Sequence, residues 1–326
     1  MDRRNFVSTA ASVVLMMAVR AEAQPATKVY RIGVLSLTKF DNTSLGAVLI
    51  EPLRARGYVV GQNIVFEERS AEGKVDRLPS LAAELERLKL DVIVAGPAAA
   101  IRAAHDATMT TPIVMAFSAD DPVKSGFVTS LSRPGGNVTG VTAQARDLAP
   151  KYVELLRDAV PGLTRFALLT NPLRPEHAEY MNKMQATLPR GVQLLTVEAR
   201  TPDQYESAFE AMTKGHADAV VILGDVIFTR DSRRLAELAL AHRLPSIYLF
   251  RAFALAGGLL AYGPDEGQLL ELAAQYVDKI LKGADPAELP VEQPTKFRFT
   301  INQKTARSLG LTLPRPMLLL ADEVIQ

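Results

Sequence analysis

Few residues in this sequence have the types and spacing that catalysis requires. It contains no GxSxG nucleophile elbow and no cysteine, which argues against the common serine and thiol nucleophiles. Asp120 and Asp121 are adjacent carboxylates that could serve acid–base chemistry or hold a cation. Because Asp121 precedes Pro122 and a predicted helix, we favour a helix N-cap role for it. The histidines lack metal-ligand spacing and are predicted at solvated helix or loop positions: His105, His177, His216 and His242.

The sequence also lacks the usual motifs for binding a nucleotide or dinucleotide cofactor. The glycines of segment 133–140 (RPGGNVTG) match neither the GxGxxG nor the Walker pattern, so a structural turn is the better interpretation. We therefore expect no cofactor and no metal, and we predict a binding protein rather than an enzyme.

Side chains suited to ligand binding follow the apolar runs of the sequence. In the first half of the chain the candidates are Ser36, Phe40, Gly96, Ala98, Ser118 and Asp121. In the second half they are Asn171, Asp225, Tyr248, Phe250, Arg251 and Tyr262. The aromatic members of the second group are either core residues or a stacking wall for a ligand, and both interpretations stay open.

Arg251 is the candidate with the most specific chemistry. It follows the apolar run 247–250, so we expect it at the sheet edge that faces a ligand. A guanidinium there would bind a ligand carboxylate through two parallel hydrogen bonds. The alternative is an arginine that pairs with a local carboxylate such as Asp225, or one that fixes a hinge.

The elements that position these groups form an α/β pattern that occurs twice. Apolar, β-rich runs alternate with segments of helical spacing, which is typical of a parallel sheet covered by helices on both faces. Strands are predicted at 31–36, 63–67, 91–95 and 112–117, and again at 165–170, 192–197, 218–223 and 245–250. Ligands of such sheets bind outside the carboxyl ends of the strands. We therefore predict two doubly wound parallel-sheet lobes, joined by a hinge, whose strand ends face each other across a cleft.

The end of the sequence indicates further crossings between the lobes. An amphipathic helix carries apolar residues from Leu269 to Ile280, and a late strand is predicted at 296–301. The predicted first lobe comprises residues 28–141 and 264–289. The predicted second lobe comprises residues 142–263 and 290–326.

The N-terminus has the features of an export signal. Arg3 and Arg4 precede an apolar stretch, residues 8–19, and small residues at 21–23 offer a cleavage site. The apolar stretch is shorter than the roughly 20 residues of a spanning helix, so we favour cleavage over a membrane anchor. We predict a signal peptide over 1–23, cleaved near Ala23, and a periplasmic protein. Twin-arginine and general secretory export both stay open.

The composition narrows the range of partners. Hydrophobic residues make up 48% of the 326 residues and charged residues 22%, with a formal net charge of +1. This composition does not indicate disorder. Nucleic-acid binding needs a concentrated basic surface, and no run of lysine or arginine follows the first few residues. We expect a monomer that binds a small molecule and no nucleic acid.

Several short motifs, taken together, resemble one known family. They are 31–36 (RIGVLS), 57–63 (GYVVGQN), 121–123 (DPV), 133–140 (RPGGNVTG), 171–172 (NP), 262–263 (YG), 289–292 (LPVE) and 321–324 (ADEV). From about Arg31 to Ile325 the sequence resembles the ABC transporter substrate-binding proteins of the tryptophan/tyrosine type, which have the type I periplasmic binding protein fold. The resemblance implies a hinged binder that works with a membrane permease and its ATPase. It also implies ligand contacts at Asn171 and Asp225, for which a strand-ending turn and a helix cap are the alternatives.

Two departures from the family pattern bear on the ligand. Many relatives carry a Thr-Pro pair after the third strand, where this chain has Pro97 and Ala98 and so lacks a hydroxyl. Many carry acidic residues in the stretch that here begins with Arg251. We therefore predict only the broad class of ligand, an aromatic or carboxylate-bearing compound that includes amino-acid-like molecules.

The predicted function is the solute-binding component of an ABC importer, which closes about its hinge on a ligand. An exported ligand-sensing module for a membrane receptor would need the same cleft. An exported enzyme of doubly wound fold is a further alternative, because fold alone does not fix function.

Overall fold

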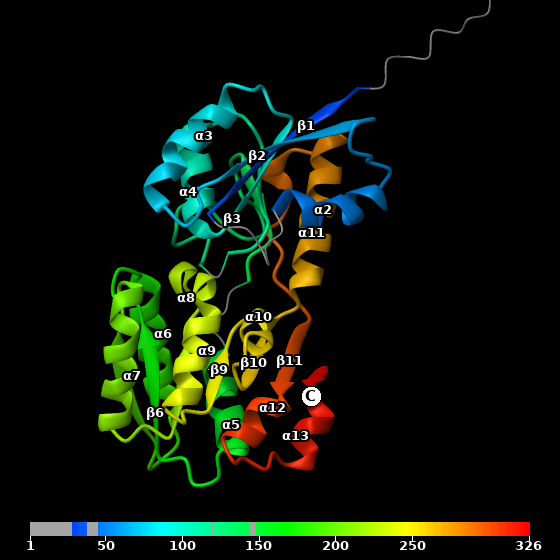
Figure 1. Ribbon diagram of the computed structural model, residues 1–326. Coiled ribbons are helices and arrows are strands. Elements are labelled where there is room, and N and C mark those ends of the chain that lie inside the picture. The colour runs from blue at the N-terminus through cyan, green and yellow to red at the C-terminus, as the bar shows by residue number, and fades with distance from the viewer. Residues whose placement is uncertain (1–27, 38–44, 119, 144–147) are drawn as a thin grey trace, which may run out of the picture.

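The computed structural model describes residues 28–37, 45–118, 120–143 and 148–326, which form two lobes (Figure 1). The predicted signal peptide and the candidate Phe40 lie outside the described residues. In the described part of the chain, no helix has both the length and the apolar character needed to cross a membrane.

The first lobe is built on a parallel sheet with the strand order β2-β1-β3-β4-β5. Its strands are β1 (Tyr30–Ser36), β2 (Ile64–Ser70), β3 (Val92–Gly96), β4 (Ile113–Met115) and β5 (Val138–Gly140). Helices α2 (Leu45–Arg54) and α11 (Glu266–Leu281) cover one face, and α3 (Leu78–Glu86) and α4 (Ala98–Ala107) cover the other. Along β1, Ile32 and Val34 enter one core cluster and Leu35 enters the other, because successive side chains of a strand point to opposite faces.

The second lobe has a sheet with the strand order β12-β11-β10-β9-β8-β6-β7. Its strands are β6 (Arg165–Thr170), β7 (Gln193–Glu198), β8 (Ala219–Ile222), β9 (Ser246–Tyr248), β10 (Leu260–Pro264), β11 (Phe297–Asn302) and β12 (Glu323–Ile325). Strands β6 to β10 run parallel, whereas β10 and β11 are antiparallel. Because β11 runs antiparallel to β10, the end of the chain returns along this sheet and completes it with β12. The sequence pattern predicted the late strand but not β12.

Helices also cover both faces of the second sheet. One face packs against α5 (Ala149–Ala159), α6 (Pro175–Thr187), α12 (Gln303–Ser308) and α13 (Arg315–Leu320). The other packs against α7 (Tyr205–Lys214), α8 (Val226–Arg230), α9 (Ser232–Ala241) and α10 (Arg251–Leu255). Short 3₁₀ helices occupy Val75–Arg77, Pro202–Gln204 and Pro286–Glu288. The predicted fold class, two doubly wound α/β lobes, is confirmed.

The connections between the lobes lie side by side where the chain leaves β5. Glu292 N donates to Gly140 O at 2.9 Å, and Thr142 N donates to Glu292 O at 3.0 Å. Gly140 has a φ of +120°, and a Cβ there would lie 2.5 Å from Met115 O, so this position requires glycine. The paired segments therefore form adjacent connections between the two sheets.

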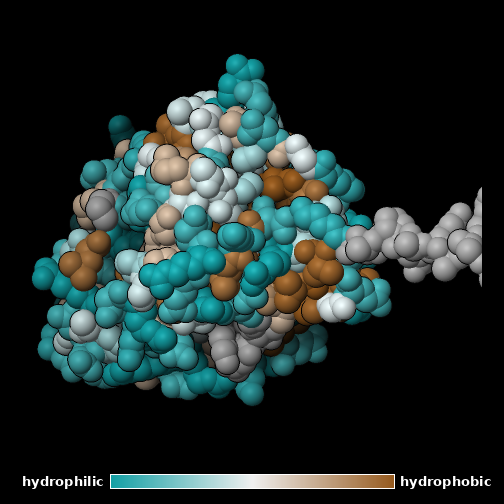
Figure 2. Space-filling model, turned by 90° about the horizontal axis from the view of Figure 1, so that it is seen from above, coloured by the Kyte–Doolittle hydropathy of each residue, from teal (hydrophilic) through white to brown (hydrophobic). Residues whose placement is uncertain are grey.

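The surface is mostly polar, as expected when the apolar residues are buried inside each lobe. Seen from above the first lobe, the molecule is largely hydrophilic, with smaller hydrophobic areas between the charged and polar ones (Figure 2). The large apolar side chains are concentrated in the layers between sheet and helices.

Candidate ligand-binding cleft

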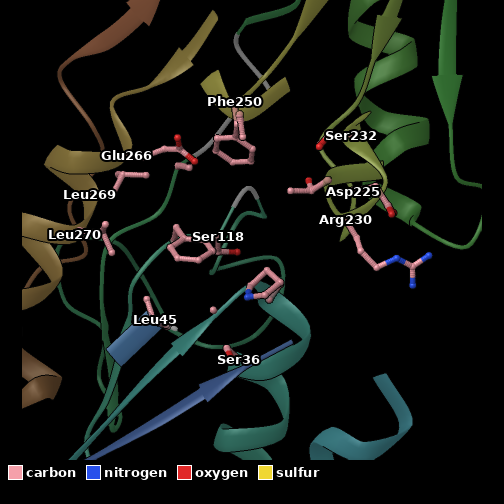
Figure 3. A pocket seen from close by; sticks show the side chains of 18 of the residues that line it. Ser36, Leu45, Ser118, Asp225, Arg230, Ser232, Phe250, Glu266, Leu269 and Leu270 are labelled. Carbon is pink, nitrogen blue, oxygen red and sulfur yellow. The ribbon is translucent and has the colours of Figure 1, made fainter. Parts of the chain in front are cut away.

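A cavity of about 720 Å³ lies between the lobes, and residues of both lobes line it. Its wall includes the carboxyl ends of parallel strands: Ser36 ends β1, Gly96 ends β3, and Asp225 and Phe250 follow β8 and β9. Figure 3 shows the Phe250 ring pointing into this space from its edge, with Asp225 on one side of it and Glu266 on the other. The cavity therefore occupies the position at which doubly wound sheets bind ligands.

The structure brings half of the predicted binding residues together in this cavity. The cavity wall includes Ser36, Gly96, Ala98, Ser118, Asp225 and Phe250. The remaining described candidates lie outside the wall: Asp121, Asn171, Tyr248, Arg251 and Tyr262. Each of these has partners that explain its placement.

Arg251 pairs with a carboxylate from the end of the chain. It begins α10, and its guanidinium donates to Glu323 of β12 through Nε and, at 2.6 Å, through Nη2. This bidentate pair ties α10 to the edge strand of the second sheet. The contact favours the alternative considered from the sequence, a carboxylate partner within the lobe, although that partner is Glu323 rather than Asp225.

Tyr248 belongs to the core of the second lobe, and Tyr262 is partly buried and packs against it. Tyr248 is 0% exposed and stacks on Phe253 at 4.5 Å between ring centroids, and its burial raises the pKa of its hydroxyl. Tyr262 stacks on Phe297 at 5.9 Å. The core interpretation considered from the sequence therefore describes Tyr248, whereas Tyr262 lies at the edge of the core. Phe250 is the member of that group that lines the cavity.

Asp121 caps a turn rather than a helix. Its Oδ1 accepts hydrogen bonds from Val123 N at 3.0 Å and Lys124 N at 3.3 Å, and residues 122–126 form turns. The predicted helix after Pro122 is thus wrong, although the capping chemistry of Asp121 is of the expected kind. Its neighbour Asp120, which is buried, lines the cavity instead.

Asp225 is held by groups from two neighbouring strand ends. Its Oδ1 accepts from Ile227 N at 2.7 Å, which caps α8. Its Oδ2 accepts from Asn171 Nδ2 at 3.1 Å, and Asn171 directly follows β6. Asp225 is therefore a helix cap, and it also lies in the cavity wall, where the predicted ligand contact would be made. Asn171 acts behind it, as a residue that orients the carboxylate.

Two ion pairs connect the lobes beside the cavity. Arg174 of the second lobe places Nη2 3.2 Å from Oδ1 and 3.3 Å from Oδ2 of Asp120 in the first lobe. Lys124 Nζ lies 2.7 Å from Glu179 Oε1 of α6. Both pairs join the loop after β4 to the segment after β6, so they hold the lobes together on this side.

Sequence reasoning missed several other wall residues. The additional members include Leu45, Pro97, Phe117, Asp120, Arg174, Arg233, Glu266, Leu269 and Leu270. Leu269 was visible in the sequence as part of the amphipathic face of α11, but it was not named as a ligand-binding candidate. The helix starts at the cavity, so its first turn serves both purposes.

Residues 35–325 match the model of a family described as ABC transporter substrate binding protein. The chain belongs to this family. ABC transporter substrate-binding proteins are solute-binding proteins found in the periplasm or outside the cell, and they bind small ligands.

Individual relatives of this substrate-binding protein are distant in sequence. The tyrosine-binding protein of Clostridioides difficile (strain R20291) is 24% identical over 268 residues, which cover 80% of this chain and 75% of the relative. A conserved domain protein from Vibrio cholerae has a TM-score of 0.82 at 25% identity, covering 91% of this chain and all of the other. An ABC domain from Streptococcus pneumoniae in complex with L-Trp has the same TM-score and coverage at 24% identity.

Proposed function

We propose that this protein captures a small amino-acid-like molecule in the cavity between its lobes and delivers it to the permease and ATPase of an ABC importer. The main support for the proposal is the cavity itself, because strand ends of both lobes line it. A ligand that touches both lobes stabilises the arrangement in which they meet, and the hinge beside Gly140 permits that closure.

The amine of such a ligand is assigned to Asp225. Its carboxylate is fixed by Ile227 and Asn171, and it is one of the acidic groups in the wall. Each carboxylate oxygen has a further lone pair with which to accept a hydrogen bond from a ligand ammonium group.

The carboxylate of the ligand is assigned to the amino end of α4. Gly96, Pro97 and Ala98 lie in the cavity wall, and Ala98 begins the helix. The first N–H groups of a helix have no partner within it and favour a negative charge. This assignment replaces Arg251, which is engaged by Glu323.

An apolar or aromatic body of the ligand fits between these two poles. Phe250 enters the cavity from the second lobe, while Leu269 and Leu270 face it from α11 (Figure 3). An aromatic ring offers a large apolar area with a defined stacking geometry. The proposed ligand class is therefore an α-amino acid with an apolar or aromatic side chain.

Calorimetry with L-tyrosine and two truncated analogues tests the proposal. Tyramine lacks the carboxylate and desaminotyrosine lacks the amine, so each should bind at least about tenfold more weakly than L-tyrosine. Asp225→Asn should weaken L-tyrosine binding more than desaminotyrosine binding. Equal affinity for all three compounds would exclude the two-pole ligand. Small-angle scattering at saturation should show a smaller radius of gyration, and an unchanged radius would exclude hinge closure.

A further inference from the structure

A buried histidine joins the two strand ends that carry Asn171 and Asp225. His177 lies near the start of α6 and is 6% exposed, so the predicted solvated position is wrong for this residue. Its Nδ1 lies 2.8 Å from Asn171 N, and its Nε2 lies 3.3 Å from Gly224 O. Because β6 and β8 are neighbouring parallel strands, the imidazole crosslinks the loops that leave them.

The backbone partners determine the protonation state of the ring. A backbone N–H can only donate, so Nδ1 must accept the hydrogen bond from Asn171 and carry no proton. A carbonyl oxygen can only accept, so Nε2 must carry the proton that it donates to Gly224 O. Both contacts therefore require the neutral imidazole with its proton on Nε2.

We propose that His177 is a positioning residue for the ligand cleft, which holds Asn171 and Gly224 so that Asp225 presents its carboxylate to the cavity. The ring acts on Asp225 from two directions. Through Asn171 it fixes the residue whose Nδ2 donates to Asp225 at 3.1 Å, and through Gly224 it fixes the adjoining peptide. The inference rests on the proposed function, because that proposal makes Asp225 a ligand contact.

Protonation of His177 at acid pH should disrupt this arrangement, because both contacts require the neutral ring. Burial lowers the pKa of His177 below its usual value of 6.5. The Gly224 carbonyl, Asp225 and Glu176 oppose this shift, and Arg174 adds to it. The ring of Phe228 in α8, at 6.4 Å, contributes no charge. Because the folded state favours the neutral ring, its stabilising contacts are complete above the ordinary pKa and are lost as the pH falls through the lowered one.

Two variants separate positioning from simple packing. His177→Gln keeps an acceptor and a donor in the side-chain amide but cannot be protonated in this range. His177→Phe keeps a ring but leaves Asn171 N and Gly224 O without their partner. The other histidines are present in every variant, so a difference in pH dependence reports on His177 alone.

The amide resonances of Asn171 and Ile227 are followed by NMR without ligand, from about pH 7.5 down to the pH at which the protein begins to unfold. In the wild type we expect both amides to titrate together and lose about tenfold in exchange protection, the equivalent of one net hydrogen bond. In His177→Gln both should stay constant. Identical pH profiles in the two proteins would overturn the inference, as would an Asn171 amide that does not respond to His177→Phe.

L-Tyrosine binding provides the functional measurement. The dissociation constant of the wild type should rise about tenfold over the same acid range, while that of His177→Gln should stay flat. A parallel rise in both proteins would overturn the role of His177 in binding. If L-tyrosine fails to bind at neutral pH, the proposed ligand class is wrong, and the NMR titration alone decides the role of His177.

Discussion

Replacing Arg174 by glutamine removes one half of the ion pair that joins the lobes beside the cavity. In the structure its Nη2 contacts both carboxylate oxygens of Asp120, whose side chain is 8% exposed, while that of Arg174 is 27% exposed. When the lobes separate, both groups become solvated. The pair therefore stabilises only the arrangement in which the lobes meet, and its loss should favour the open one.

The size of the effect follows from burial and geometry. A hydrogen bond to a charged group contributes about 1.5–3 kcal/mol, and distances of 3.2 and 3.3 Å favour the lower end. We expect about 1.5 kcal/mol, which is about a tenfold shift toward the open arrangement. Lys124 and Glu179 are 59% and 36% exposed, so Lys124→Gln should cost about 0.2–1 kcal/mol and serves as the matched control.

Pulsed EPR measures this equilibrium directly in the protein without ligand. The chain has no cysteine, so two introduced cysteines can be labelled specifically. Met109 in the first lobe is 76% exposed and the Lys214 side chain in the second is 79% exposed, which makes both suitable label sites. The distance distribution of Arg174→Gln should contain a larger open fraction than that of the wild type or of Lys124→Gln.

A double-mutant cycle identifies the interaction. If the Asp120–Arg174 contact acts as a pair, Asp120→Asn combined with Arg174→Gln should open the protein little more than the stronger single substitution. Full additivity of the two shifts would refute the reasoning, and so would equal distance distributions in Arg174→Gln and the wild type.

Three further predictions concern other contacts. Arg251→Ala should lower the free energy of unfolding by only about 1 kcal/mol in urea titrations, since the pair is partly exposed. The same variant should leave L-tyrosine affinity unchanged in calorimetry, because Arg251 does not line the cavity. The hydrogen bond from Arg251 lowers the pKa of Glu323, so wild-type stability should decline as the pH falls below 4.5 through that lowered value, and less so in the variant. Gly140→Ala should cost at least about 1–3 kcal/mol by urea unfolding, because its φ is +120° and Met115 O blocks a Cβ. Phe250→Ala should weaken L-tyrosine binding in calorimetry by at least about tenfold through lost stacking area.

The sheets were predictable because their sequence signal is local. The run 165–170 was predicted as a strand and forms β6 over the same residues, since a strand covered on both faces must be apolar throughout. Helix α11 was visible for a similar reason, as its buried residues repeat at helical spacing. The strand β12 carried no such signal, because it is short and only half-buried and depends on β11 for its hydrogen bonds.

Cavity residues were predictable where the backbone alone decides their position. Ser36 and Gly96 end neighbouring strands β1 and β3, so parallel pairing brings them to one edge whatever their side chains do. His177 illustrates the opposite case. Its burial depends on Asn171 and Gly224 lying at the right distance in the folded lobe, and no spacing in the sequence reports that distance.

For Arg251 the backbone position was predictable from the sequence, but the direction of the side chain was not. Its place after β9 followed from the strand pattern, and the backbone does leave the sheet there. The direction of its guanidinium depended on which carboxylate lies nearest. Glu323 reaches it because β10 and β11 are antiparallel, and β12 then pairs with β11 at the sheet edge. A long charged side chain at a strand end is therefore weak evidence for a ligand contact. A short one such as Asp225, fixed by its own helix and by the next strand, is much stronger evidence.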